Sequence, residues 1–470
     1  MSIDLVLEER GVSRRHKAVV AAIVAVLVFD GVDLQLAALS APTMMREWNL
    51  SPAAFGPALA AALLGMAVGT AAGGRLGDRR GRRRVLLGSV LLFGVMVMAA
   101  GASTGIVELA ALRFVCGLGF GAAIPNAYVL VAELLPPGSR TKAMGLLGMA
   151  TVAGGAVAAA TALVVIPALG WRWMFLICGT PSLALLLVLV RTVPESPRFV
   201  LAREGSEAAA RLLGRMTGRP VDPGELEQQD TKAPAAKAVR APGGRLLTRP
   251  HLRLNLGLWT AFFAIFFANI AINSWLPSVL SRAGLSLTGS FGASMVFFLF
   301  AMAGAVSMGY LVAVFGSRPT LIGGVLLSVA AVGAMPLLVR LARSVPAMGG
   351  TGFLVLAGLA GLGMAVVNAG LSAVGTSAYP VESRATGLGV AMTSGRIASV
   401  AGALAGGAVL SMTRDDTAAF FAVIVAALVL CGLGILTVDR HLAPARTERG
   451  ARGAAQRVTA GRARGNPTSG

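Results

Sequence analysis

The sequence has 470 residues, of which 56% are hydrophobic and only 13% are charged, with a mean hydropathy of +0.76. Typical soluble domains carry about 25% charged residues. A chain of this length could not cover its apolar surface with so few polar groups, so a water-soluble globular protein is excluded. The net charge of +20 raises nucleic-acid binding as an alternative, which depends on where the charges lie.

Twelve apolar segments are long enough to cross a membrane, because about 20 apolar helical residues span the ~30 Å hydrocarbon core of a bilayer. The sequence therefore predicts an all-α membrane protein with twelve transmembrane helices in two groups of six. The predicted spans are 18–41, 53–74, 85–104, 109–132, 143–167, 172–193, 254–280, 289–315, 319–339, 348–375, 387–411 and 417–438.

These spans divide the chain into five predicted parts. Two bundles of six helices, 18–193 and 253–438, are separated by a polar central segment, 194–252. A short segment, 1–17, precedes them, and a basic tail, 439–470, follows them. The tail is polar and rich in arginine, so we expect it to be disordered.

The positive charges are concentrated on one side of the predicted membrane topology. Of the 41 lysines and arginines, 33 lie in the termini and in the loops on the same side, 6 lie in the opposite loops and 2 lie within spans. The positive-inside rule then places both termini in the cytoplasm, with the protein in the inner membrane. This bias explains the high net charge, so nucleic-acid binding is not needed to account for it. We expect the basic tail to lie near anionic lipid of the bilayer.

The two halves repeat each other. Residues 74–83 read GRLGDRRGRR and residues 309–318 read GYLVAVFGSR, which share both outer glycines, a leucine and the last arginine. Residues 140–145 and 384–389 form a second pair in the same order. Transporters built from two such repeats place their substrate site near the bilayer midplane, between the halves.

The motifs resemble those of the major facilitator superfamily. The sequence GRLGDRRGRRR at 74–84 matches its loop signature G-x-L-x-D-R-x-G-R-R, and the resemblance extends over about residues 14–440. Within that superfamily, FDGVDLQ at 29–35 and RFVCGLGFGAAIPNAYVLVAEL at 113–134 resemble the first and fourth spans of the aromatic acid:proton symporter family. The segment PESPRF at 194–199 is shared with that family and with sugar porters. The resemblance implies the major facilitator fold, with the first, fourth, seventh and tenth spans lining a central cavity.

Four charged residues lie well inside the predicted spans: Asp30, Asp33, Arg113 and Arg396. At 1.5 Å per helical residue, Asp33 and Arg113 lie at similar depth, and Asp30 shares a helix face with Asp33. Two carboxylates in a partly dry site cannot both readily ionise. We therefore predict that Asp30, Asp33 and Arg113 couple transport to protons, with a purely structural Asp–Arg pair as the alternative.

Arg396 lies near the midplane in a half whose spans contain no acidic residue, so we expect it to bind a substrate carboxylate through its planar guanidinium. The alternative is an arginine satisfied by backbone carbonyls or reaching across to Asp30. Amide side chains of the cavity-lining spans are further candidates for binding substrate, although interhelical hydrogen bonds would explain each of them equally well. They are Gln35, Asn126, Asn269, Asn273 and Asn368.

The loop at 74–84 lacks the order of a phosphate-binding loop and follows no strand. The resemblance implies that its Asp78 and arginines form a conformational latch that holds the outward-open state, while a plain positive-inside cluster is the alternative. Ala313 replaces the usual aspartate in the second half, which argues against an ionic latch there. The candidate latch residues are Gly74, Asp78, Arg79, Gly81, Arg82, Arg83, Glu133, Arg140 and Arg384.

Nothing in the sequence indicates catalysis. The three cysteines lie in apolar segments and the three histidines lie at segment ends, so we expect no disulfide, no metal site, no cofactor and no enzyme. The resemblance implies a monomeric importer of small aromatic acid anions with protons, working by alternating access. A proton-coupled efflux antiporter and a symporter of non-aromatic organic acids remain alternatives.

Overall fold

The computed structural model describes residues 3–227, 249–344, 346–379, 384–413 and 417–444, and these residues form helices and their connections. Twelve of the helices are long and apolar enough to cross a membrane, which confirms the predicted fold class. The first bundle consists of α2 (Arg14–Glu47), α3 (Pro52–Arg80), α4 (Arg82–Gly101), α5 (Ile106–Leu134), α6 (Pro137–Leu169) and α7 (Trp171–Thr192). The second consists of α11 (Arg249–Arg282), α12 (Leu287–Phe315), α13 (Ser317–Ser344), α14 (Pro346–Ala378), α15 (Arg384–Met412) and α16 (Ala418–Thr437).

The helix boundaries follow from local sequence. Ser13 begins α2 as an N-cap whose hydroxyl accepts the backbone N–H of His16, and Ser51 does the same at α3 with Pro52 in the first turn. The short break between α3 and α4 is Gly81, with φ at 98°, a conformation that side chains disfavour. The helices extend beyond the predicted spans because their polar ends continue past the apolar stretch.

Small residues bring helices of the first bundle into backbone contact. A Cβ added to Gly31 of α2 would lie 1.8 Å from the carbonyl oxygen of Thr151 on α6. Any side chain at this position would therefore push α2 away from α6, as expected where small residues set membrane helix packing. The contact matters because Gly31 lies between Asp30 and Asp33, so it fixes their distance from α6.

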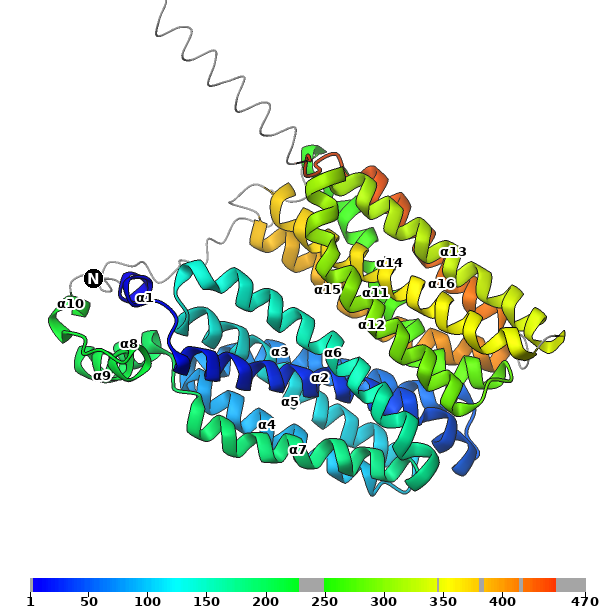
Figure 1. Ribbon diagram of the computed structural model, residues 1–470, viewed down its shortest axis with the longest axis horizontal. Coiled ribbons are helices and arrows are strands. Elements are labelled where there is room, and N and C mark those ends of the chain that lie inside the picture. Colours follow the sequence, from blue (N-terminus) through cyan, green and yellow to red (C-terminus); the bar gives the residue numbers. More distant parts are fainter. Residues whose placement is uncertain (1–2, 228–248, 345, 380–383, 414–416, 445–470) are drawn as a thin grey trace, which may run out of the picture.

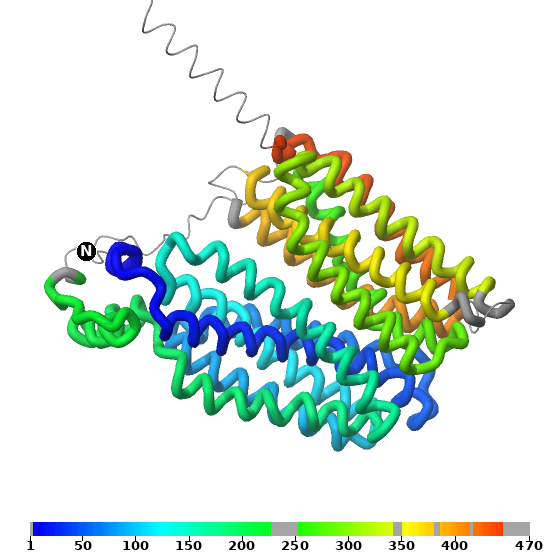
Figure 2. The backbone as a smooth tube through the Cα atoms, in the orientation of Figure 1, coloured from blue at the N-terminus to red at the C-terminus, as the bar shows by residue number. Residues whose placement is uncertain are grey.

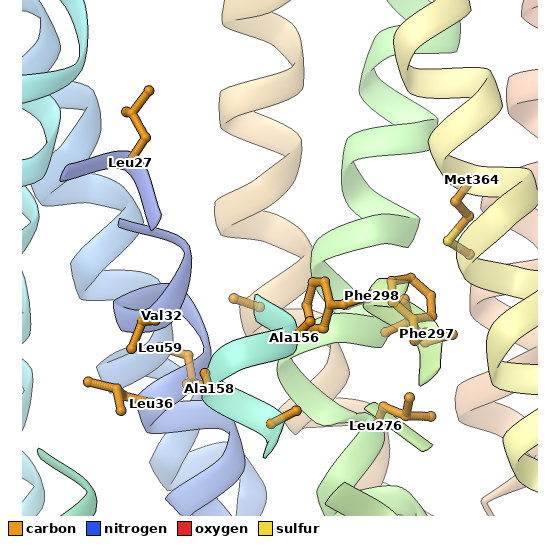
Figure 3. Close-up of a cluster of buried hydrophobic side chains, with 14 of the residues drawn as sticks. Leu27, Val32, Leu36, Leu59, Ala156, Ala158, Leu276, Phe297, Phe298 and Met364 are labelled. Carbon is orange, nitrogen blue, oxygen red and sulfur yellow. The ribbon is translucent and has the colours of Figure 1, made fainter. Parts of the chain in front are cut away.

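The two bundles touch through three helix pairs: α3 with α15, α6 with α12, and α2 with α11. We refer to the end of the molecule at which the N-terminus lies as the loop end. The bundles meet at the opposite end and diverge toward the loop end, as Figures 1 and 2 show. At the opposite end, the backbone N–H of Ala53 on α3 donates to Ser411 Oγ on α15 at 2.8 Å. Near the middle, Phe298 of α12 lies against Ala156 of α6 (Figure 3).

A small subdomain lies beyond the helix ends at the loop end (Figure 1). It consists of α1 (Ile3–Arg10), α8 (Pro197–Glu204), α9 (Ser206–Thr217) and α10 (Pro223–Glu227). Its core is separate from that of the bundles and contains Ile3, Val6, Leu7, Val200, Ala209, Ala210, Leu213, Val221 and Leu226. The polar composition of 194–252 did not predict this core. The predicted disorder of the basic tail falls on 445–470, outside the described residues.

Candidate transport site

An ion pair between α2 and α5 lies at the centre of the first bundle. Arg113 Nη1 is 2.5 Å from Asp33 Oδ1, and both side chains are less than 5% exposed. The thiol of Cys116, almost one turn after Arg113, donates to the same carboxylate oxygen at 3.7 Å. The similar depths estimated from the sequence thus correspond to a direct contact, although the role of the pair in proton coupling stays a prediction.

Asp30 lies one turn before Asp33 and has a different environment. Its side chain is buried, and its Oδ2 accepts a long hydrogen bond of 3.4 Å from Thr151 Oγ1 on α6. Its Oδ1 is buried and has no hydrogen-bond partner among the described residues. A buried carboxylate oxygen without a partner is costly when ionised, and the role of Asp30 in proton coupling stays a prediction.

Arg396 lies on α15 of the second bundle. It lies twelve residues after the start of that helix, about 18 Å along it. Its side chain is exposed, and it has no acidic group within ion-pair distance in the described part of the chain. The helix that carries it packs against α11 of its own bundle and against α3 of the first bundle.

A cavity of about 140 Å³ lies between the bundles and is lined by residues of α2, α3, α5, α6, α11 and α12. An engineered cavity of about 150 Å³ in another protein accepts benzene, whereas drug-sized ligands need about 300–1,000 Å³. The space therefore suits one aromatic ring in the conformation described. Its polar lining side chains are Gln35, Arg113, Thr151, Asn269, Asn273 and Ser274.

Three of the predicted substrate residues meet in this cavity. Asn273 Nδ2 donates to Asn269 Oδ1 at 2.7 Å, one turn earlier on α11. Across the cavity, Gln35 Oε1 is buried and has no partner among the described residues, so it can accept a hydrogen bond from a ligand. The sequence analysis missed Thr151, because a single threonine in an apolar span carries no signal that separates it from helix packing.

The other predicted substrate residues do not line this cavity. Asn126 donates to the carbonyl oxygens of Gly73 at 3.0 Å and Ala122 at 2.8 Å, so it joins α5 to α3. Asn126 therefore forms the interhelical hydrogen bonds that the sequence analysis gave as the alternative to substrate binding. Asn368 lies half-buried on α14, and Arg396 lies nearer the loop end.

The candidate latch residues form a network within the first half. Arg82 pairs with Glu133 of α5 at 3.0 Å and with Asp78 at 3.2 Å, and Glu133 also accepts a hydrogen bond from Ser196. Arg83 donates to two carbonyl oxygens at the end of α7, and its backbone N–H donates to Glu195. The network thus ties the α3–α4 loop to α5 and α7. The sequence analysis did not single out Ser196 and Glu195, although they lie in PESPRF.

Arg140 does not pair with Glu133. Its guanidinium lies 2.6 Å from Asp4 of α1, and Arg198 of α8 contacts the same carboxylate at 3.0 Å. Partial burial opposes ionisation of Asp4, but these two arginines outweigh it and hold the pKa of Asp4 below its usual value.

The remaining candidate latch residues make fewer contacts. Arg79 is exposed, and its carbonyl oxygen accepts a hydrogen bond from Arg203 at 3.5 Å. Gly74 lies beside open space. The side chain of Arg384 falls outside the part that the structure describes.

The fold and motifs agree with comparisons to known proteins. The family model described as the Major Facilitator Superfamily matches residues 21–339 and 293–467. The chain belongs to this superfamily of membrane transporters, as the loop signature indicated. The 4-hydroxybenzoate transporter PcaK of Pseudomonas putida is 30% identical over 452 residues, which cover 94% of this chain and 97% of that protein. The gallate transporter of Pseudomonas putida is 29% identical over 395 residues, covering 82% and 84% of the two chains.

Solved structures show the same fold. The xylose transporter XylE from E. coli, in a partially occluded inward open conformation, matches with a TM-score of 0.70 over 91% of this chain and 99% of that chain. Its sequence identity is 19%, so this likeness concerns the fold alone.

Proposed function

We propose that this protein imports small aromatic carboxylates together with protons across the inner membrane, acting as a monomer by alternating access. The similarity to transporters of 4-hydroxybenzoate and gallate supports the substrate class. The one-ring size of the cavity between the bundles supports it independently. Gln35, Asn269 and Asn273 are the groups we assign to ring hydroxyls of the substrate.

The observation that carries the proposal is the balance of charged residues within the membrane-spanning helices. Asp30 and Asp33 of α2 lie deep in the first bundle, where Asp33 contacts Arg113, and Arg396 lies on α15 of the other bundle. When the site is empty and both acids are ionised, these four charges cancel. When a substrate monoanion binds Arg396 and a proton binds Asp30, the charges cancel again.

This balance gives a physical reason for coupling. A site loaded with the anion alone has one net negative charge, and a site with the proton alone has one net positive charge. Alternating access requires the site to close within a medium of low dielectric constant, where an uncompensated charge costs at least ~2.5–3.5 kcal/mol. Only the empty and the doubly loaded site avoid this cost, which is the requirement for symport.

The orientation follows from the charge bias of the loops. The side with 33 of the 41 basic residues is the loop end, which we assign to the cytoplasm. The divergence of the bundles toward that end then corresponds to an inward-facing state. In this state Asp78 is largely exposed and pairs within its own loop, which supports a latch that is released here and engaged in the outward-facing state.

Uptake into proteoliposomes tests the proposal. With the interior at pH 8 and the exterior at pH 7, we expect labelled benzoate or 4-hydroxybenzoate to enter proteoliposomes much faster than protein-free liposomes, into which only the neutral acid diffuses. Cyclohexanecarboxylate is the matched non-aromatic control and should show far less of this protein-dependent uptake. Accumulation driven by the opposite gradient would indicate an antiporter, and equal uptake of the control acid would remove the aromatic specificity.

A further inference from the structure

A basic pocket lies at the loop end of the first bundle, away from the transport site. It has a volume of about 820 Å³ and lies between the start of α2, the start of α4, the end of α7 and the helices α8 and α9. Five of its lining side chains are arginines and two are glutamates: Arg15, Arg83, Arg191, Arg211, Arg215, Glu195 and Glu204. We refer to it as the arginine pocket.

The arginines of this pocket are not neutralised by acids. In the part of the chain that the structure describes, none of the five forms a salt bridge. Glu195 is already engaged, since its Oε1 accepts the backbone N–H groups of Arg83 and Ser196, each at 3.0 Å. The pocket thus retains an excess of positive charge that an anion could balance.

Part of the pocket is held in place by the backbone. Arg83 donates to the carbonyl oxygens of Val193 at 2.6 Å and Val190 at 2.7 Å, and Arg15 donates to that of Arg215. These bonds join α4, α7, α2 and α9, so they fix the walls of the pocket. Because two guanidinium groups are already ordered, an anion that binds between the walls loses less conformational entropy.

The surface next to the pocket is apolar. On α7, the residues just before Arg191 include Leu187, which is 61% exposed, and Val190, which is 48% exposed. They belong to a membrane-spanning helix that ends at Thr192. Hydrocarbon therefore lies against α7 directly below the arginines, and the arginines lie at the level of lipid headgroups.

We propose that the arginine pocket binds the phosphate of an anionic phospholipid whose acyl chains lie along α7. Guanidinium groups bind phosphate through paired hydrogen bonds, and basic pockets at the cytoplasmic ends of membrane helices attract anionic headgroups. Free phosphate would use the same arginines but would gain nothing from the apolar surface of α7. The inference uses the proposed membrane orientation, and it does not depend on the transported substrate.

Binding can be measured by native mass spectrometry of the full-length protein, delipidated in detergent and titrated with phosphatidylglycerol or phosphatidylethanolamine. We expect preferential binding of phosphatidylglycerol. The variant R191Q/R211Q should weaken it roughly 25-fold, since we expect each arginine that contacts the headgroup in the pocket to contribute about fivefold in affinity. The matched control is R75Q/R84Q, which removes two exposed arginines of the same half that do not line the pocket. This control should bind like the wild type.

Several results would overturn the proposal. Equal affinity of R191Q/R211Q and the wild type for phosphatidylglycerol would exclude the pocket, and equal affinity for the two lipids would exclude charge recognition. Displacement of the lipid by inorganic phosphate at the same concentration would identify a free-anion site. Arg211 lies exposed on α9 outside the membrane, so R211Q alone, with an expected fivefold loss, tests the pocket even if the double variant is unstable.

Discussion

Replacing Asp30 with asparagine should separate net uptake from exchange. Asparagine keeps the size of the side chain and can still accept the hydrogen bond from Thr151 Oγ1. It leaves the Asp33–Arg113 ion pair intact. The substitution therefore changes the charge of the site with little expected effect on folding.

The charge balance sets the size of the effect. In D30N, the empty site holds one net positive charge, because Arg396 no longer has Asp30 to balance it. The site loaded with a substrate monoanion is neutral. If closing around an uncompensated charge costs ~2.5–3.5 kcal/mol, the return of the empty transporter should slow by about 100-fold, whereas the loaded transporter still crosses.

Accumulation and counterflow in the same proteoliposomes measure the two steps. With a gradient of one pH unit, and after subtraction of uptake by protein-free liposomes, initial gradient-driven uptake should be about 100-fold slower in D30N than in the wild type. Exchange of labelled for unlabelled substrate should fall less than tenfold in D30N.

The matched control is Asp78→Asn, the same substitution in the loop between α3 and α4, which should slow accumulation and exchange by the same factor. The reasoning fails if D30N accumulates substrate like the wild type. It also fails if D30N loses exchange as completely as accumulation while the protein is present at normal amounts.

Four other outcomes are expected. Asp33→Asn should lower the free energy of unfolding by about 3–5 kcal/mol, because it leaves Arg113 buried without its partner, and adding Arg113→Gln should recover part of that loss in denaturant unfolding. Arg396→Lys should weaken direct substrate binding at least about tenfold without changing the unfolding transition, because lysine cannot form paired hydrogen bonds with a carboxylate. Asp78→Asn should leave equilibrium substrate affinity within about twofold of the wild type, as measured by direct binding, because it changes only the populations of the conformations. The low pKa of Asp4 means that its ion pairs stabilise docking of α1 above the unfolded pKa of about 3.9 and are lost as pH falls through the folded pKa. The protection factors of the α1 amides, which correct hydrogen exchange for its intrinsic pH dependence, should therefore be constant from pH 8 to 5 and fall in stronger acid.

The sequence predicted those features that the bilayer itself imposes. Twelve helices follow from the length needed to cross the hydrocarbon core, and the similar depth of Asp33 and Arg113, which the structure shows in contact, follows from rise per residue once the topology is known. Charged residues inside spans are few and need partners, so their pairing is strongly constrained. Depth along a helix could therefore be estimated from sequence.

Rotation of each helix about its axis could not be predicted in the same way. Asn126 and Asn269 are both amides inside spans, yet one joins α5 to α3 and the other lines the cavity. Which face turns inward depends on close contacts such as that of Gly31 with Thr151, which involve residues more than 100 positions apart. The subdomain core escaped prediction for a similar reason, because Ile3 and Leu7 find their partners about 200 residues later.

The charge balance also limits which acids the site can carry with one proton. When a monocarboxylate is bound at Arg396 and Asp30 is protonated, the site holds two negative and two positive charges. The negative charges are those of Asp33 and the substrate, and the positive charges are those of Arg113 and Arg396. A dicarboxylate in the same place would leave one net negative charge, and closure of the site would then carry the same cost of ~2.5–3.5 kcal/mol unless a second proton entered. The acid one turn away is Asp33, and protonating it would break its 2.5 Å ion pair with Arg113. We therefore expect selectivity for monoanions if the proposed roles of Asp30 and Arg396 hold, because the ion pair that joins α2 to α5 keeps Asp33 ionised.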